Sequence, residues 1–219
     1  MGQKVLAYGI IPLYTILFTR GYGWFTTNLS VIANYFDKKR AFFIWGLLVG
    51  GYYYWVHRRI REMSEQSPLC LKAIPGAILL LFCSITTPYL PEEMPLKADL
   101  HIIFAFASAV LLFLYLLAVV IGQLAKGRRP YRLYLVTIIG IILISIYLLV
   151  RVGIVCSALE IFVTVSTIVL SERLVNRMKA DRAETPREKE MPCKDTDFVD
   201  SIYTAYQSSL TTEQEIAEG

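Results

Sequence analysis

The stretch 100-LHIIFAFASAVLLFLYLLAVVIGQLA-125 contains no Asp, Glu, Lys or Arg, and most of its residues are apolar. A helix needs about 20 predominantly apolar residues to cross the hydrocarbon core of a bilayer. The stretch meets that length without a charge, so it predicts a transmembrane helix. We therefore expect the fold to be organised around a membrane.

The composition of the whole chain supports this expectation. Of its 219 residues, 55% are apolar, whereas soluble domains usually contain about 45–50%. The apolar residues form six blocks between short polar loops, and each block predicts one span. The predicted fold is all-α: a polytopic six-helix transmembrane bundle in one domain, residues 1–178. The predicted spans are residues 5–19, 41–56, 71–90, 100–125, 133–150 and 152–170.

Basic residues lie mainly on one side of these six predicted spans. The segments 57-HRRIRE-62, 126-KGRRPYR-132 and 171-SERLVNRMKADR-182 share that side, and the acidic segment 91-PEEMPLKAD-99 lies on the other. Cytoplasmic loops carry the excess of Lys and Arg. We therefore expect both termini in the cytoplasm and the protein in the plasma (inner) membrane. The cluster 37-DKKR-40 falls on the outer side, and we interpret it as an interfacial anchor.

The segment between the first two predicted spans, 24-WFTTNLSVIANYFDKKRAFF-43, is too polar to cross a membrane. Its apolar residues recur at intervals of three and four, which is the period of an amphipathic helix. We expect a short outer helix with Thr26 or Thr27 as its N-cap. Positions three and four apart are neighbours on a helix, so Ser30, Asn34 and Asp37 should share one face and point into the bundle.

Several charged or titratable residues lie in or beside the predicted spans, where facing lipid is costly. Gathering them in one polar cluster in the outer half of the bundle would remove that cost. Two interpretations of the cluster stay open: a pocket that binds a ligand, and a structural network of hydrogen bonds. The candidate ligand-binding residues are Asn28, Ser30, Asn34, Asp37, Asp99, His101, Arg151 and Glu160.

Catalytic and metal-binding motifs are sparse. The two histidines, His57 and His101, belong to opposite ends of the predicted bundle and cannot share a metal. A hydrolase built from Ser30, His101 and Asp99 meets the objection that residues two apart on a helix do not face each other. There is no G-x-S-x-G, P-loop or Rossmann motif. We expect no enzyme activity, no metal and no cofactor.

The cysteines and the tail add little chemistry. None of Cys70, Cys83, Cys156 and Cys193 forms a C-x-x-C pair or lies in a predicted outer loop, so we expect no disulfide and no zinc site. Residues 179–219 predict a cytoplasmic tail that is mostly disordered, because 181–197 is rich in charge and poor in apolar residues. The expected partners are membrane lipids, a protein partner for the tail and a second copy of the chain, but no nucleic acid.

The order of these segments resembles a known group. An outer N-L-S-V-I-A-N motif follows the first predicted span, and the fourth opens with 99-DLHIIFAFAS-108. Over residues 1–175 this order is similar to six-span membrane proteins of the "domain of unknown function 998" type, and more distantly to the DRAM/FRAG group. The resemblance implies that Asn28, Ser30, Asn34 and His101 take the places of that group's polar motif and histidine. The glycine expected beside the serine is missing from 31–33.

The resemblance implies an integral membrane protein without established catalysis. Together with the polar cluster, it favours a protein that binds a lipid, a small amphiphile or a protein partner through the outer half of the bundle. The first alternative is a transporter or channel-like protein with Arg151 and Glu160 on the pathway. The second alternative is an intramembrane hydrolase that uses His101.

Overall fold

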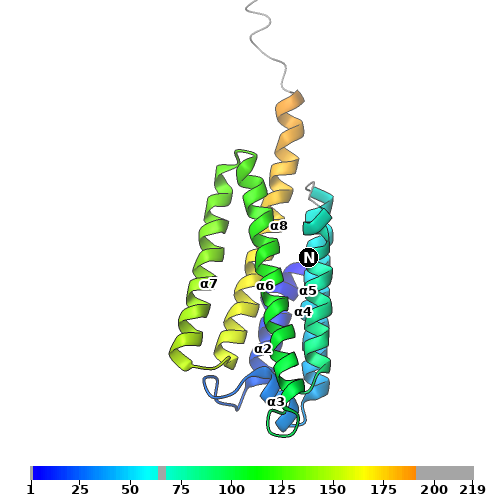
Figure 1. Cartoon of the computed structure of the whole chain (residues 1–219). Helices are drawn as coiled ribbons and strands as arrows, with labels where there is room; N and C mark the ends of the chain where they lie inside the picture. The colour runs from blue at the N-terminus through cyan, green and yellow to red at the C-terminus, as the bar shows by residue number, and fades with distance from the viewer. Residues whose placement is uncertain (1, 64–67, 191–219) are drawn as a thin grey trace, which may run out of the picture. The chain divides into compact units, whose positions relative to one another are not determined.

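A computed structural model describes the backbone of residues 2–63 and 68–190, and in these residues the chain is helical without any strand. The all-α prediction is therefore confirmed. The chain divides into two compact units, Met1–Lys179 and Ala180–Gly219. The helices, which Figure 1 shows, are α1 (Gly2–Val5), η1 (Leu6–Ile10), α2 (Ile11–Thr19), α3 (Leu29–Tyr35), α4 (Lys39–Met63), α5 (Pro68–Thr86), α6 (Pro95–Ala125), η2 (Arg129–Tyr131), α7 (Arg132–Val152) and α8 (Ser157–Glu190).

The six-span prediction is wrong. Within the described residues, two helices are long and apolar enough to cross a membrane: α6, and the helical stretch Arg129–Val152 that joins η2 and α7. Among the described residues, the apolar stretch of α5, Lys72–Thr86, is shorter than a span. A membrane association therefore rests on α6 and α7.

The other predicted spans fail for local reasons. The block 5–19 is divided by the π-helix η1, which ends just before Pro12, a residue that lacks a backbone N–H. The block 41–56 lies within α4, where three consecutive tyrosines and three glycines dilute the apolar character. The block 152–170 begins in a loop, because α8 starts only at Ser157.

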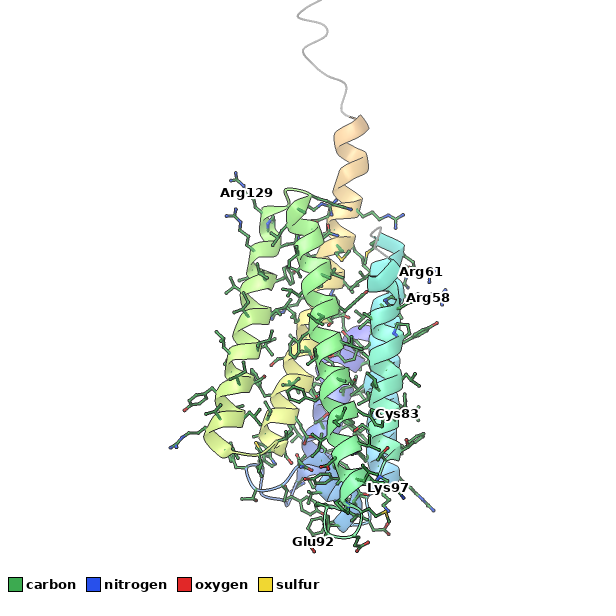
Figure 2. All side chains as sticks on the ribbon, viewed as in Figure 1. Arg58, Arg61, Cys83, Glu92, Lys97 and Arg129 are labelled. Carbon is green, nitrogen blue, oxygen red and sulfur yellow. The ribbon has the colours of Figure 1, made fainter. Side chains whose placement is uncertain are left out.

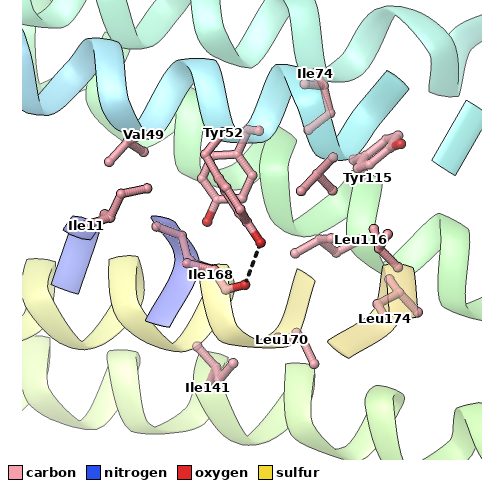
Figure 3. Packing of buried hydrophobic residues seen from close by; sticks show 14 of the residues in the cluster. Ile11, Val49, Tyr52, Ile74, Tyr115, Leu116, Ile141, Ile168, Leu170 and Leu174 are labelled. Atoms are coloured by element: carbon pink, nitrogen blue, oxygen red, sulfur yellow. Dashed lines mark hydrogen bonds between the residues drawn. The ribbon is translucent and has the colours of Figure 1, made fainter. Parts of the chain in front are cut away.

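The core of the first unit lies between α4, α6 and α8, and its large side chains are fully buried (Figure 3). Tyr52 of α4 and Leu116 of α6 pack against the cluster that contains Ile168 and Leu174 of α8. The hydroxyl of Tyr52 donates a hydrogen bond to the carbonyl oxygen of Ile168 at 3.1 Å. This bond gives the buried phenol a partner for its hydroxyl.

Helices α4 and α5 approach each other closely where α4 has glycine. A Cβ on Gly46 would collide with the Cδ1 atom of Ile85, and a Cβ on Gly50 would lie 3.3 Å from the Phe82 ring. Glycine at these two positions lets α5 pack directly against the backbone of α4. Gly51, the next residue, faces open space and has no such role.

The tail prediction is partly corrected. Helix α8 continues to Glu190, so residues 179–190 are helical rather than disordered. Glu, Lys, Arg and Ala are good helix formers. Because α8 has already begun before this segment, these residues continue the helix although their charged composition predicted disorder. Residues 191–219, with the rest of the predicted tail and Cys193, lie outside the described residues.

Candidate functional site

Helix α3 begins at an N-cap supplied by Asn28. The backbone of Asn28 is extended, and its Oδ1 accepts a hydrogen bond from the Val31 N–H at 2.7 Å. Its Nδ2 donates to the Val155 carbonyl at 3.4 Å, in the loop before α8. The predicted outer helix is present, but the predicted caps are wrong: the hydroxyls of Thr26 and Thr27 both donate to the carbonyl of Gly23 instead.

Helices α3 and α8 cap each other at their first turns. The Leu29 N–H donates to Glu160 Oε2 at 2.7 Å, so a side chain of α8 satisfies the start of α3. In return, the N–H and hydroxyl of Ser157 donate to the Thr27 carbonyl at 2.6 and 2.9 Å. The first N–H groups of a helix have no partner within the helix. This exchange satisfies them and fixes α3 against α8.

The side chain of His101 joins α6 to α3 and α5. Its Nδ1 lies 2.8 Å from the Ser84 carbonyl oxygen and 3.0 Å from that of Thr87. Because carbonyl oxygens only accept, Nδ1 must carry the proton. In the neutral ring Nε2 is then an acceptor, and the hydroxyl of Ser30 donates to it at 2.6 Å. Ser30 and His101 are both buried.

Two further groups complete this cluster. The amide of Asn34 donates from Nδ2 to the Ser30 carbonyl at 2.8 Å, one turn back along α3. The ring of Tyr89, in the loop after α5, lies 5.4 Å from the His101 ring between centroids. Five of the eight predicted residues therefore meet around α3: Asn28, Ser30, Asn34, His101 and Glu160.

The other three predicted residues do not join the cluster, because their side chains are exposed: Asp37, Asp99 and Arg151. The inward orientation predicted for Asp37 is wrong because α3 ends at Tyr35, and Asp37 lies beyond it in a left-handed turn with φ of 52°. Asp99 lies two residues before His101 on α6, so it faces away from the buried side. Arg151 lies in the last turn of α7.

The charge state of Glu160 reflects its surroundings. Burial raises the pKa of its carboxyl from the usual 4.5 to about 7, and the hydrogen bond from the Leu29 N–H opposes that rise. A carboxyl with a pKa of about 7 changes its protonation near physiological pH. In the junction between α3 and α8, Glu160 is therefore the residue that we expect to gain or lose a proton near neutral pH.

A second polar cluster lies inside the bundle, and the sequence reasoning missed it. The hydroxyl of Tyr52 donates to Glu172 Oε2 at 3.3 Å, and Asn176 Nδ2 donates to Glu172 Oε1 at 3.2 Å. The hydroxyls of Tyr53 and Thr167 lie 2.6 Å apart. The sequence signal that could have revealed this cluster is the presence of polar groups in the middle of otherwise apolar stretches: two tyrosines in α4, and a threonine and a glutamate in α8.

The described residues bring no three His, Cys, Asp or Glu side chains together as metal ligands. Cys83 and Cys156 carry free thiols.

No known protein family, curated protein or solved structure matches this chain. The resemblance to the "domain of unknown function 998" group therefore stays a prediction.

Proposed function

We propose that this protein is an integral membrane protein, anchored by α6 and α7, that binds a lipid or similar amphiphile beside α3. The observation that carries the anchor is the apolar surface of these helices. Soluble proteins rarely expose contiguous apolar patches of more than a few hundred Å². The exposed apolar side chains of α6 and α7 include Ile102, Ile103, Phe106, Leu114, Ile121, Leu133, Val136, Ile139, Leu143, Ile146 and Val150.

Charge gives the proposed anchor its direction. The turn between α6 and α7 contains Lys126, Arg128, Arg129 and Arg132, and Arg58 and Arg61 of α4 lie at the same end of the bundle (Figure 2). The opposite end carries Glu92 and Lys97, and the cluster 37-DKKR-40 also lies there, at the start of α4. Because cytoplasmic loops are enriched in Lys and Arg, the basic end faces the cytoplasm and the α3 end faces outward.

Exposed aromatic residues support binding at the α3 end. Trp24 and Phe25 precede α3, Tyr35 ends it and Phe36 follows it, and all four side chains are exposed. Aromatic residues, Trp and Tyr above all, concentrate at the level of the lipid headgroups. These aromatics support a position of the cluster of Ser30, His101 and Glu160 near the boundary between headgroups and acyl chains, where an amphiphile presents both a polar and an apolar part.

The test is to identify what the full chain carries from its native membrane. The protein is purified in a mild detergent, and bound molecules are released and identified by native mass spectrometry. We expect a lipid or amphiphile in stoichiometric amounts, reduced in Trp24→Ser. The matched control is Tyr54→Ser, which removes another exposed aromatic, from α4. Equal binding in both variants, or no bound amphiphile in the wild type, contradicts the proposal.

A further inference from the structure

We propose that Ser30 is a nucleophile and His101 its general base, and that the pair hydrolyses an acyl ester in the amphiphile bound beside α3. This inference rests on the proposed function, because the substrate class is that amphiphile. It extends the function from binding to acyl-ester chemistry.

The geometry of the Ser30–His101 pair suits nucleophilic catalysis. Nucleophilic catalysis by serine needs a base within hydrogen-bond reach, and the base must itself be oriented by a third group. Ser30 Oγ lies 2.6 Å from His101 Nε2. The Ser84 and Thr87 carbonyls, at 2.8 and 3.0 Å from Nδ1, fix the tautomer that leaves Nε2 free to take a proton. Asp99, which sequence reasoning considered for this role, is exposed and not needed for it.

Several helices hold the pair in place. Ser30 comes from α3, His101 from α6 and Ser84 from α5, so three separate helices hold the two reacting atoms and their support. The Ser84 hydroxyl also donates to the His101 carbonyl at 3.2 Å, which ties α5 to the backbone that carries the imidazole. A pair held by several elements keeps its geometry between substrate molecules.

The depth of the pair in the proposed membrane also fits an ester substrate. His101 lies six residues after Pro95, the first residue of α6, which corresponds to roughly 9 Å along the helix axis. In the proposed orientation this is just below the level of the headgroups, where lipid ester bonds lie. Ser30 and His101 are 6% and 4% exposed. Such shielding from water suits a substrate that arrives from the lipid phase.

The proposed reaction has two steps. Ser30 Oγ attacks the ester carbonyl carbon and passes its proton to His101 Nε2. The bond to the alcohol then breaks, and the departing alcohol oxygen takes that proton, leaving Ser30 acylated. A water molecule gives a proton to His101 and its oxygen to the acyl carbon. The bond from the acyl carbon to Oγ breaks, Oγ recovers the proton, and a carboxylic acid leaves.

The test uses a fluorescent alkyl fluorophosphonate on membranes that contain the full chain. Ser30 Oγ should form a bond to phosphorus as fluoride leaves, and peptide mapping should place the adduct on Ser30. Ser30→Ala should abolish labelling, and His101→Ala should slow it by about 100-fold, the lower range for a general base. The control is Ser145→Ala on α7, whose hydroxyl donates to Ile141 in its own helix, and it should label as the wild type does.

The outcomes separate this inference from the proposed function. Native mass spectrometry of the same preparations reports the bound amphiphile. A bound amphiphile without an adduct on Ser30 overturns the hydrolase and leaves the binding function standing. Absence of any bound amphiphile from the wild type and from Ser30→Ala contradicts the binding function, and the substrate class with it. Mapping the wild-type adduct decides the question even if Ser30→Ala does not fold.

Discussion

Glu160 is the residue whose protonation should set the pH dependence of stability. Its pKa is about 7 in the folded protein and 4.5 when free of burial. Between these values the folded state keeps a proton that the unfolded state has released, so the free energy of unfolding falls as pH rises from about 4.5 to 7. Glu160→Gln has no proton to lose and keeps an oxygen for the Leu29 N–H, so it should flatten this part of the curve.

The measurement is thermal unfolding of the detergent-solubilised protein at several pH values across this window. The unfolding temperature of the wild type should fall relative to that of Glu160→Gln as pH increases. Glu92→Gln, at an exposed position, is the control and should track the wild type. Parallel curves for wild type and Glu160→Gln would show that burial does not govern this carboxyl.

Two adjacent tyrosines offer a second test at the residue scale. The hydroxyl of Tyr53 is buried against Thr167 at 2.6 Å, whereas Tyr54 is 57% exposed. Thr167 also donates to the Val163 carbonyl at 2.6 Å, which makes Tyr53 the donor in the pair. Tyr53→Phe should lower the free energy of unfolding by about 1 kcal/mol, the usual net value of a hydrogen bond.

Tyr54→Phe is the matched control and should leave stability unchanged. Chemical or thermal unfolding of both variants under identical detergent conditions makes the comparison. An equal loss in the two variants would mean that the Tyr53 hydroxyl gains nothing from Thr167.

At the scale of elements, the close contact between α4 and α5 depends on glycines of α4, which have no side chain. Gly50→Leu should push the Phe82 ring away from α4, and overpacking of this kind typically costs about 1–3 kcal/mol. Gly51→Leu introduces the same side chain into open space, where it should have no cost and gain the better helix propensity of leucine. The two variants differ by one position, so the difference between their free energies of unfolding reports the cost of packing a leucine against Phe82.

A loss of stability in Gly51→Leu as large as that in Gly50→Leu would show that α5 does not pack on the Gly50 face of α4. Gly46→Leu, directed at Ile85, should behave as Gly50→Leu does. The expected order of stability is therefore Gly51→Leu, then wild type, then the other two variants.

Sequence patterns predict the helices of this protein better than the contacts between them. The block 100–125 lies within α6, and the periodicity around Ser30 predicted a helix where α3 is found. The partners of His101 Nδ1 were not predictable because they are the backbone carbonyls of Ser84 and Thr87, and every residue type carries such a carbonyl. Asp37 was misplaced because periodicity does not reveal where a short helix ends.

For the candidate site, a polar cluster was predictable and its connections were not. Facing lipid is costly for His101 and Glu160, and this argument correctly placed both against the same small helix. It failed for Asp37, Asp99 and Arg151 because exposed residues near helix ends can reach water or headgroups at little cost. Whether a polar side chain is buried at this end of the bundle therefore depends on its position along and around a helix as well as on its charge.

At the scale of the whole molecule, the error in the number of spans has a physical cause. Counting apolar residues gives Tyr and Trp the same weight as Leu or Ile, and it ignores the Gly residues between them. Helix α4 contains many such residues together with basic residues at both ends, and this combination separates it from α6 and α7. Length, mean hydropathy and the scarcity of charged residues, taken together, distinguish the two helices that meet the requirements for a span.

The membrane anchor can be tested by placing one charge at two depths on α7. Leu143 lies near the middle of α7 and is 60% exposed, and Leu133 lies in its first turn and is 71% exposed. In water, lysine at either exposed position would cost little. At the centre of a bilayer lysine costs about 2.5–3.5 kcal/mol, whereas near the interface its ammonium group can reach the headgroups.

Leu143→Lys should therefore reduce the fraction of protein that stays in the membrane pellet after an alkaline carbonate wash, and Leu133→Lys should leave that fraction close to the wild-type value. The two variants share the same added charge, so only depth distinguishes them. If both behave as the wild type does, the exposed face of α7 meets water or a partner protein and not lipid. If both are lost equally, the effect comes from α7 packing, because Leu133 and Leu143 would then be equivalent in spite of their different depths.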